Sequence, residues 1–319
     1  MGDLTPVSAD TIDWLLDGDP AVRLGVMRDL LGADAQSLAQ EQSRIANSGW
    51  GARLLELQDA SGTWSGALYS PKFTSTHYTL LTLRRLGLSH DHPGAGKAAQ
   101  VLLDAGARAD HGINFTSRPG AHSETCISGM CLSMFSYFGL RDARVVSLAE
   151  YMLGEQMPDG GWNCQRHRGA THSSFHTTTS ALEGLLDFHV AHAGHGLPVA
   201  EALERGREFL LQHRLYRSHR SGEVVSAAMT RFPFPPMWQH DVLRALEHCA
   251  AASAPRDERL LDPIELVLSK RDAAGRYPQY AGPRGQYFFG YETVGKPSRM
   301  NTVRVLRVMR WWAAQGSGP

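Results

Sequence analysis

A short turn that combines glycine with an aromatic side chain recurs along the chain, and it limits the possible folds more than any other feature. The turn occurs at Gly62-Thr-Trp64, Gly112-Ile-Asn-Phe115, Gly160-Gly-Trp162 and Gly275-Arg-Tyr277. An irregular loop and then a stretch with helical periodicity follow each turn, so the repeating unit is about fifty residues long. A unit of this length predicts similar supersecondary units that stack and share one core.

The stretches between the turns have the apolar period of helices. Apolar residues recur at i, i+3, i+4 and i+7 after each loop, as they do on one face of a helix. These stretches begin at Thr76, Thr125, Phe175, Trp238 and Asn301. A second set, which precedes several turns and loops, begins at Val145, Val199 and Pro263. Almost no segment alternates strictly between apolar and polar residues as a strand does, so we predict an all-α protein made of helical hairpins.

The repeat leaves two architectures open, an open solenoid and a closed ring. HEAT and armadillo arrays are open, but they lack a recurrent Gly-aromatic turn with an irregular loop after it. The loops here carry His, Cys and aromatic residues just before helix starts, which would gather polar groups at one mouth of a ring. We therefore predict an α/α toroid over residues 51–319. Residues 1–50, with a helix start at Asp19-Pro20, are expected to form an N-terminal helical cap that belongs to the same structural domain.

Composition limits where the chain works and what it binds. Its 319 residues include 32 basic and 32 acidic side chains, so we expect no nucleic-acid partner. The N-terminus lacks a basic leader with an apolar segment, and no segment approaches the roughly 18 apolar residues of a membrane span. The four cysteines are too few for a disulfide scaffold. A cytoplasmic protein with reduced cysteines is expected.

Two motifs in consecutive units resemble the zinc-binding stretch of protein prenyltransferase β subunits. That family places an acidic residue, a spacer and a cysteine at the start of one inner helix, and Glu124-Thr-Cys126 matches with Glu in place of Asp. The family's aromatic-His-Thr sequence at the next inner helix matches Phe175-His176-Thr. Over about residues 50 to 312 the repeats resemble the prenyltransferase and squalene-oxidocyclase repeat superfamily. Stretches such as Leu68-Tyr-Ser-Pro-Lys and Phe234-Pro-Pro-Met-Trp also look like bacterial proteins loosely labelled squalene cyclase.

The resemblance implies a zinc ion held by Glu124, Cys126 and His176. Zinc favours thiolate, imidazole and carboxylate ligands, and a catalytic site keeps a fourth position open. A thiolate at a helix N-terminus is stabilised by the helix dipole, so we expect a lowered pKa for Cys126. Singly, each residue could instead be a core or capping residue. Rival ligands are Cys164, His172, His122 and His240.

Further site residues follow from the same comparison and from the aromatic content. Arg118 stands where the family has a diphosphate-binding Arg, and His77 resembles its diphosphate-binding His, whereas Ala121 and Ile127 stand where the family has Lys and Tyr. We expect catalytic roles for Glu124, His77 and Tyr78. Aromatic faces can stabilise a cation or line an apolar pocket. The expected substrate-binding set is Arg118, Trp64, Phe175, Trp238 and Tyr291, although Trp64 could instead be a structural wedge between repeats.

These residues favour a zinc-dependent enzyme with an apolar central cavity that transfers a prenyl or alkyl group to a thiol or similar nucleophile of a small molecule. A lyase or a terpene-cyclase-like isomerase on the same scaffold is the alternative, and a non-catalytic toroid that binds an apolar ligand or peptide is another. Proton-initiated polyene cyclisation is disfavoured because no DxDD motif is present. The related β subunits work with an α subunit, so a partner chain is conceivable, but the N-terminal cap favours a protein that acts alone.

Overall fold

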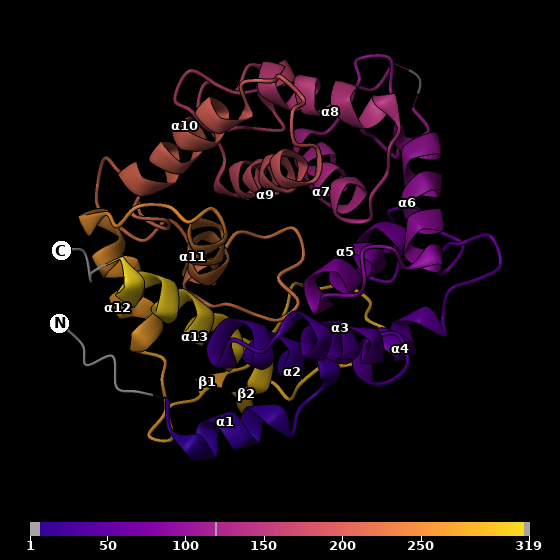
Figure 1. Cartoon of the computed structure of the whole chain (residues 1–319). Helices are drawn as coiled ribbons and strands as arrows, with labels where there is room; N and C mark the ends of the chain where they lie inside the picture. Colours follow the sequence, from indigo (N-terminus) through magenta and orange to yellow (C-terminus); the bar gives the residue numbers. More distant parts are fainter. Residues whose placement is uncertain (1–6, 119, 316–319) are drawn as a thin grey trace.

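The helices form a ring with an inner and an outer layer (Figure 1). The structure is a computed structural model, and it describes residues 7–118 and 120–315. The inner layer consists of α5 (Thr76–Leu86), α7 (Thr125–Tyr137), α9 (Phe175–Ala191), α11 (Val242–Ala251) and α13 (Arg299–Ala314). The outer layer consists of α4 (Gly49–Leu55), α6 (Pro93–Gly106), α8 (Ala143–Gly154), α10 (Val199–Gln212) and α12 (Leu261–Leu268). The predicted α/α toroid is confirmed.

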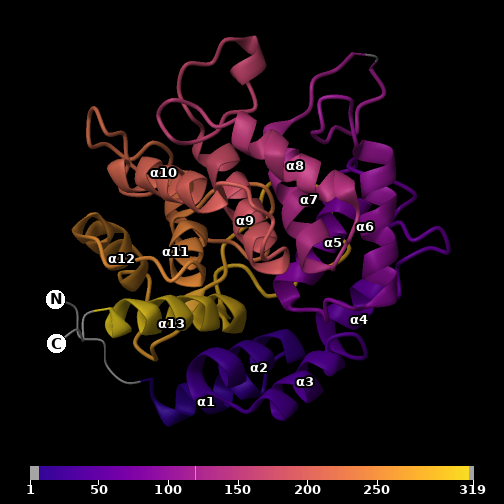
Figure 2. The same cartoon turned by 45° about the horizontal axis from the view of Figure 1, so that its top comes forward.

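The N-terminal helices close the ring between its first and last inner helices (Figure 2). They are α1 (Ala9–Leu16), α2 (Pro20–Val26), the π-helix η1 (Met27–Leu31) and α3 (Ala35–Arg44). Helix α2 packs against α13 and α4, and α4 packs against α5. Asp19 caps α2 by accepting a hydrogen bond from the backbone N–H of Ala21 at 2.9 Å, and Pro20 occupies the first turn. This segment therefore packs against both ends of the repeat array.

Short elements connect the helices. They are the 3-10 helices η2 (Arg166–Arg168), η3 (Ala227–Thr230) and η4 (Glu258–Leu260), and the strands β1 (Tyr277–Pro278) and β2 (Pro297–Ser298). The two strands pair antiparallel, with Tyr277 opposite Ser298. Among the residues that the structure describes, no helix is both long and apolar enough to span a membrane.

A hydroxyl near the start of four inner helices, α5, α7, α9 and α13, anchors the turn that precedes each of them. The backbone N–H of Trp162 donates to Oγ1 of Thr178 at 3.0 Å, and that of Trp64 donates to Oγ1 of Thr76 at 3.0 Å. Tyr277 and Thr302 form the same bond at 3.0 Å. In the Gly112 unit the bond runs from Ile113 to Oγ of Ser128 at 2.9 Å, so Ile113 rather than Phe115 holds the aromatic position of the other units. The recurring turns thus tie these four inner helices to the loops that precede them.

Two facing glycines bring α7 and α9 unusually close. A Cβ atom at Gly184 would lie 2.3 Å from the carbonyl oxygen of Gly129, and one at Gly129 would lie 2.6 Å from that of Ser180. Glycine inside a helix costs about 1 kcal/mol relative to alanine. The close backbone contact offsets this cost and holds the starts of the two helices, which carry Cys126 and His176, side by side.

Candidate functional site

Hydrogen bonds join the starts of successive inner helices into one mouth of the ring. At the start of α7, the backbone N–H of Cys126 donates to Sγ of Cys164, in the loop before α9, at 3.0 Å. At the start of α9, Nδ1 of His176 accepts from the backbone N–H of His240, just before α11, at 2.8 Å. The repeat register therefore gathers polar side chains at this end, as the sequence predicts.

Cys126 and Cys164 form a coupled thiol pair. The Cys126 thiol and backbone N–H both donate to Cys164, and the Thr177 hydroxyl lies 3.5 Å from the Cys164 sulfur. These donors lower the pKa of Cys164, whereas donation to Cys164 and then burial raise the pKa of Cys126 well above its usual value. The expectation that Cys126 has the lowered pKa is wrong, because the thiol of Cys126 donates its proton in the hydrogen bond to Cys164. Cys164 is the more nucleophilic thiol.

The structure does not gather the predicted zinc ligands Glu124, Cys126 and His176 around one point. Within residues 7–118 and 120–315, no group of three or more His, Cys, Asp or Glu side chains is placed to hold a metal ion. Because Nδ1 of His176 accepts a hydrogen bond, Nε2 must carry the proton of the neutral ring. A zinc-binding histidine needs the reverse, with one nitrogen free for the metal and the other donating. Glu124 precedes α7 without a side-chain capping bond.

The rival ligands form no metal-holding group with the thiol pair among the described residues. His240 is buried, and its ring bonds to Oγ1 of Thr179 at 2.7 Å and to the carbonyl oxygen of Leu215 at 2.6 Å. Burial lowers the pKa of His240 to about 3, so it stays neutral. His122 stacks on His167 in an exposed region, with ring centroids 4.8 Å apart, and His172 is also exposed. Zinc binding stays a prediction that elemental analysis can test.

The two predicted catalytic residues on α5 are buried. Tyr78 donates to the hydroxyl oxygen of Tyr69 at 3.0 Å, and burial raises its pKa far above the usual value, so it cannot act as a base near neutral pH. His77 faces Sγ of Cys131 at 3.6 Å with Nδ1, and its Nε2 has no hydrogen-bond partner among the described residues. Burial, and then the charges of Lys72 and Arg85, lower the pKa of His77 to about 3. It is a neutral core group.

An aromatic cluster covers the inside of the mouth. Phe73, Tyr78 and Met237 form its buried part, and the half-buried Tyr69, Trp238 and Tyr287 pack against them. The ammonium group of Lys72 lies 5.1 Å from the ring centroid of Tyr69 and 5.5 Å from that of Trp238. Trp238, a predicted substrate-binding residue, therefore lies at the mouth. Lys72 was not predicted, since a lone lysine in a loop gives no local signal.

Two other predicted substrate-binding residues lie in the walls of the ring. Trp64 is fully buried, and its Nε1 donates to the carbonyl oxygen of Leu54 at 2.6 Å. Phe175 is 9% exposed and packs against Phe209 and His213 on the outer side of α9. Trp64 is therefore the structural wedge that the sequence also allowed. The ring of Phe175 also contacts that of His240, with centroids 5.1 Å apart, and its substrate-binding role stays a prediction.

The last two predicted binding residues lie away from the thiol pair. Arg118 is exposed in the loop before α7, and no ion pair of the described residues involves it. Tyr291 is half-buried, and its ring contacts those of Trp50 and Phe234 with centroids 5.6 Å and 5.8 Å away. Phe234 also lines a pocket within the ring, so Tyr291 packs against one of the residues of that pocket's wall.

Asp241, which the sequence analysis missed, is the most perturbed acid at the mouth. It caps α11, with Oδ1 accepting from the backbone N–H of Arg244 at 2.9 Å, and its other oxygen accepts no hydrogen bond from the described residues. Asp241 is 3% exposed, and burial raises its pKa to about 6. It lines a pocket of about 220 Å³ together with the polar residues Arg231, Gln239 and His240 and with small or apolar residues such as Pro236 and Met237.

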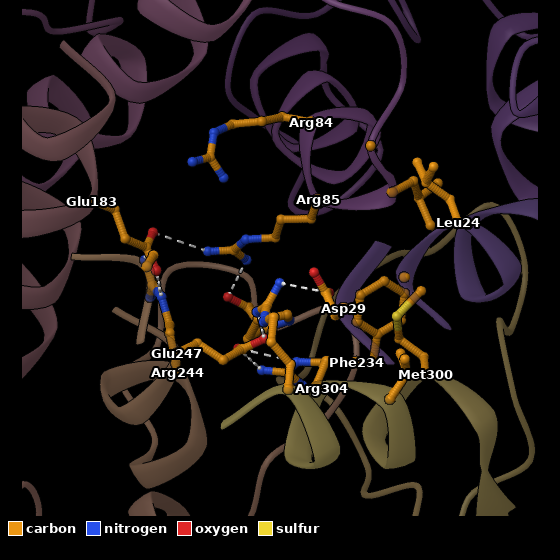
Figure 3. Close-up of a pocket in the computed structure, with 18 of the residues that line it drawn as sticks. Leu24, Asp29, Arg84, Arg85, Glu183, Phe234, Arg244, Glu247, Met300 and Arg304 are labelled. Carbon is orange, nitrogen blue, oxygen red and sulfur yellow. Dashed lines mark hydrogen bonds and ion pairs between the residues drawn. The ribbon is translucent and has the colours of Figure 1, made fainter. Parts of the chain in front are cut away.

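A second pocket, of about 290 Å³, lies within the ring (Figure 3). It begins roughly two turns into α5 and α9, since Arg84 and Glu183 are the ninth residues of these helices. Apolar side chains, among them Leu24, Phe234 and Met300, line one side, and charged side chains line the other. The expectation of an apolar central cavity is therefore corrected, because the ring encloses a charged network.

Comparison with known proteins returns relatives in structure only. No protein-family model matches the chain, and no curated protein sequence matches it. The type II terpene cyclase MstE from Scytonema is similar at 15% identity and a TM-score of 0.45, over 93% of this chain and 89% of that one. A variant of MstE in complex with geranylgeranyl dihydroxybenzoate has the same identity and TM-score, over 93% and 88%. The ent-copalyl diphosphate synthase from Streptomyces platensis is similar at 14% identity and a TM-score of 0.43, and the chain covers 50% of it.

Proposed function

We propose that this toroid is an enzyme, an isomerase or lyase that moves a proton on a small, apolar, prenyl-like substrate at the mouth of the ring, with Asp241 as its acid–base group. The observation that carries the proposal is the buried Asp241 carboxyl, which lines a pocket and has one oxygen free of partners among the described residues. A buried titratable group in a cleft is a candidate for catalysis.

The pKa of Asp241 suits general acid–base catalysis. A proton-transfer catalyst works best when its pKa lies near the operating pH, because both protonation states are then available. Burial moves the pKa of Asp241 from 3.8 to about 6, which brings it into this range. The carboxylate would remove a proton from an allylic carbon and return one at the far end of the double bond. The electrons of the double bond shift and no other reactant is needed.

The same pKa disfavours direct protonation of an isolated alkene. That step forms a carbocation and needs a much stronger acid than a carboxyl group with a pKa of about 6. The proposal is therefore proton transfer at a carbon already activated by a neighbouring double bond or carbonyl, and not polyene cyclisation.

The walls of the pocket indicate the class of substrate. Pro233, Pro236 and Met237 provide apolar surface, and Arg231 adds an exposed guanidinium that no ion pair of the described residues neutralises. Guanidinium groups bind carboxylates in a planar, two-pronged geometry. An unsaturated acid with a prenyl-like body would place its carboxylate on Arg231 and its carbon chain beside Asp241.

The test is deuterium incorporation. The protein is incubated in D2O with unsaturated prenyl acids such as geranic acid, and mass spectrometry measures deuterium bound to carbon and any shift of the double bond. Incorporation is expected with a rate that titrates near pH 6, and Asp241→Asn should abolish it. Asp142→Asn, an N-cap exchange on α8 far from the pocket, is the matched control. No incorporation by the unmodified protein, or equal rates in Asp241→Asn, would refute the proposal.

Zinc-dependent transfer of a prenyl or alkyl group to a thiol is the second candidate, and it rests on the thiol pair. The lowered pKa of Cys164 makes this sulfur a ready ligand for a metal. Elemental analysis of the purified protein, with Cys126→Ala and His176→Ala, tests this hypothesis. Stoichiometric zinc that is lost in both variants would support the zinc hypothesis, and a purified protein without metal would refute it.

A further inference from the structure

The charges of the central pocket do not balance. Among the described residues that line it are six arginines and four carboxylates. The arginines are Arg28, Arg84, Arg85, Arg244, Arg304 and Arg307, and the carboxylates are Asp29, Glu183, Asp187 and Glu247. The lining thus carries two positive charges in excess, in a place where burying an unpaired charge is costly.

The carboxylates are already used by some of the arginines. Glu183 accepts from Nε and Nη2 of Arg244 at 2.7 and 2.8 Å, so both of its carboxylate oxygens already bind this arginine. Glu247 accepts from Nη2 of Arg304 at 2.6 Å and also binds Arg307. These carboxylates hold the guanidinium groups in place without neutralising all of them.

Donors remain unused on the other side of the pocket. Arg84 binds Asp187 through Nη2, but its buried Nε has no hydrogen-bond partner among the described residues. Arg85 donates through Nη1 to the backbone carbonyl oxygens of Pro236 and Met237, the latter at 3.1 Å, and its Nη2 reaches a carboxylate, that of Glu183, only at 3.4 Å (Figure 3). Burial, and then the charge of Arg244, lower the pKa of Arg85 to about 9, so this cation is destabilised where it stands. An added anion would relieve that penalty.

A buried histidine with both ring nitrogens unused lines the same pocket. His248 is 4% exposed, and neither Nδ1 nor Nε2 has a hydrogen-bond partner among the described residues. A neutral imidazole offers one N–H donor, and burying it unpaired has a cost comparable to a lost hydrogen bond. An oxygen atom of a bound ligand would satisfy it.

The pocket narrows from an open rim to a closed floor. At the rim, the side chains of Arg28 and Arg307 are 48% and 36% exposed, whereas those of Arg244 and Arg304 at the floor are only 1% and 6% exposed. A ligand can therefore enter beside η1 and α13 and be held by arginines that are already fixed by their partners. Such preorganised guanidinium groups bind phosphate oxygens well.

We propose that the central pocket is a binding site for a small organic phosphate. Its phosphate group would lie among Arg84, Arg85 and Arg304, within reach of the His248 ring, and its apolar part would lie against Leu24, Phe234 and Met300. A phosphate group carries about two negative charges at pH 7 and matches the excess of the lining, whereas a carboxylate supplies only one. The site adjoins the Asp241 pocket, with which it shares Pro236, but its argument does not depend on the proposed acid–base activity.

Calorimetric titration of the full-length protein tests the site. The probes are hexyl phosphate, inorganic phosphate and hexanoate at pH 7. Hexyl phosphate is expected to bind at least about tenfold more tightly than either of the others, because only it combines two charges with an apolar chain. Inorganic phosphate that binds as tightly as hexyl phosphate would overturn the role of the apolar wall, and no binding of either phosphate would overturn the site.

Two substitutions with opposite expected effects make the test specific. His248→Phe removes a donor without breaking a hydrogen bond of the described residues, so it should weaken hexyl phosphate binding about tenfold. Glu247→Gln frees Arg304 and Arg307 and should strengthen binding by a similar factor. Glu150→Gln, an exposed site on α8, makes the same change in net charge away from the pocket and should change nothing.

The fold of each variant is checked by circular dichroism before titration, since Glu247 belongs to a buried ion pair. His248→Phe keeps the test decisive if Glu247→Gln does not fold. Equal affinity of the unmodified protein and His248→Phe, or equal strengthening by Glu150→Gln and Glu247→Gln, would show that the arginines form only a structural network.

Discussion

Replacement of Asp241 by asparagine is expected to stabilise the fold at alkaline pH and to leave it nearly unchanged in acid. The folded-state pKa of Asp241 is about 6, against 3.8 for the free side chain, and burial is the main cause. Between these two values the folded state holds a proton that the unfolded state has released. The stability of the fold therefore falls as the pH rises from about 4 through about 6.

The magnitude follows from the size of this pKa difference. About two pKa units at 1.36 kcal/mol each correspond to about 3 kcal/mol of lost stability once Asp241 is ionised. Asparagine cannot ionise, and it can still accept the hydrogen bond from the backbone N–H of Arg244 as an N-cap. We expect Asp241→Asn to raise the free energy of unfolding by about 3 kcal/mol at pH 8 and by less than about 1 kcal/mol at pH 4.

Urea unfolding at pH 4, 6 and 8 measures the effect, and the control is Asp142→Asn. Asp142 also caps a helix, but its hydrogen bonds to Arg144 lower its pKa to about 2, so its charged form stabilises the fold. Asp142→Asn should therefore destabilise the protein at pH 8, the opposite sign. A stability gain in Asp241→Asn that does not change between pH 4 and pH 8, or a loss at pH 8, would refute the assignment of a buried, strained charge.

Other predictions concern the packing and the thiol pair. Gly184→Ala should lower the free energy of unfolding by about 1–3 kcal/mol in urea titration, because the new Cβ would meet the backbone of α7. Thr178→Val should cost about 1–3 kcal/mol in the same assay, because it leaves the buried N–H of Trp162 without its acceptor. Iodoacetamide should label Cys164 before Cys126 in peptide mass mapping, and Cys126→Ala should slow the labelling of Cys164 by removing its thiol donor; labelling in the reverse order would contradict the direction of the pair.

The fold could be predicted because its determinants are local and repeated. Three of the four turns have glycine at a fixed place, and Gly62, Gly160 and Gly275 have φ values of 95°, 92° and 80°, where other residues are strained. In the fourth turn His111 holds this place, with a φ of 68°. The partner of each turn is a hydroxyl close to the helix start, such as Thr178 for Trp162. A signal that is short, strict and repeated along the chain is visible in a single sequence.

The candidate site was harder to predict because its chemistry arises from distant segments. Asp241 stands before an apolar helical stretch, where an aspartate is typical of an N-cap. Its raised pKa comes from burial by other elements, which no local pattern records. The arginines of the central pocket come one or two at a time from different helices, among them Arg84 on α5, Arg244 on α11 and Arg304 on α13. Only the motif with Cys126 and His176 could be recognised in the sequence. The sequence does not show which atoms of these two side chains carry protons.

The places where this chain departs from a simple apolar core lie around the inside of its ring. A toroid that served only as a scaffold could fill its centre with leucine and phenylalanine, as the walls between its layers do. Instead it buries the charge of Asp241 at the mouth and an excess of arginine deeper inside. Burying these charges costs free energy, which the packing of the surrounding helices must offset. Such costs are typical of sites that bind or react. The interior of the ring is therefore where ligands of this protein should be sought.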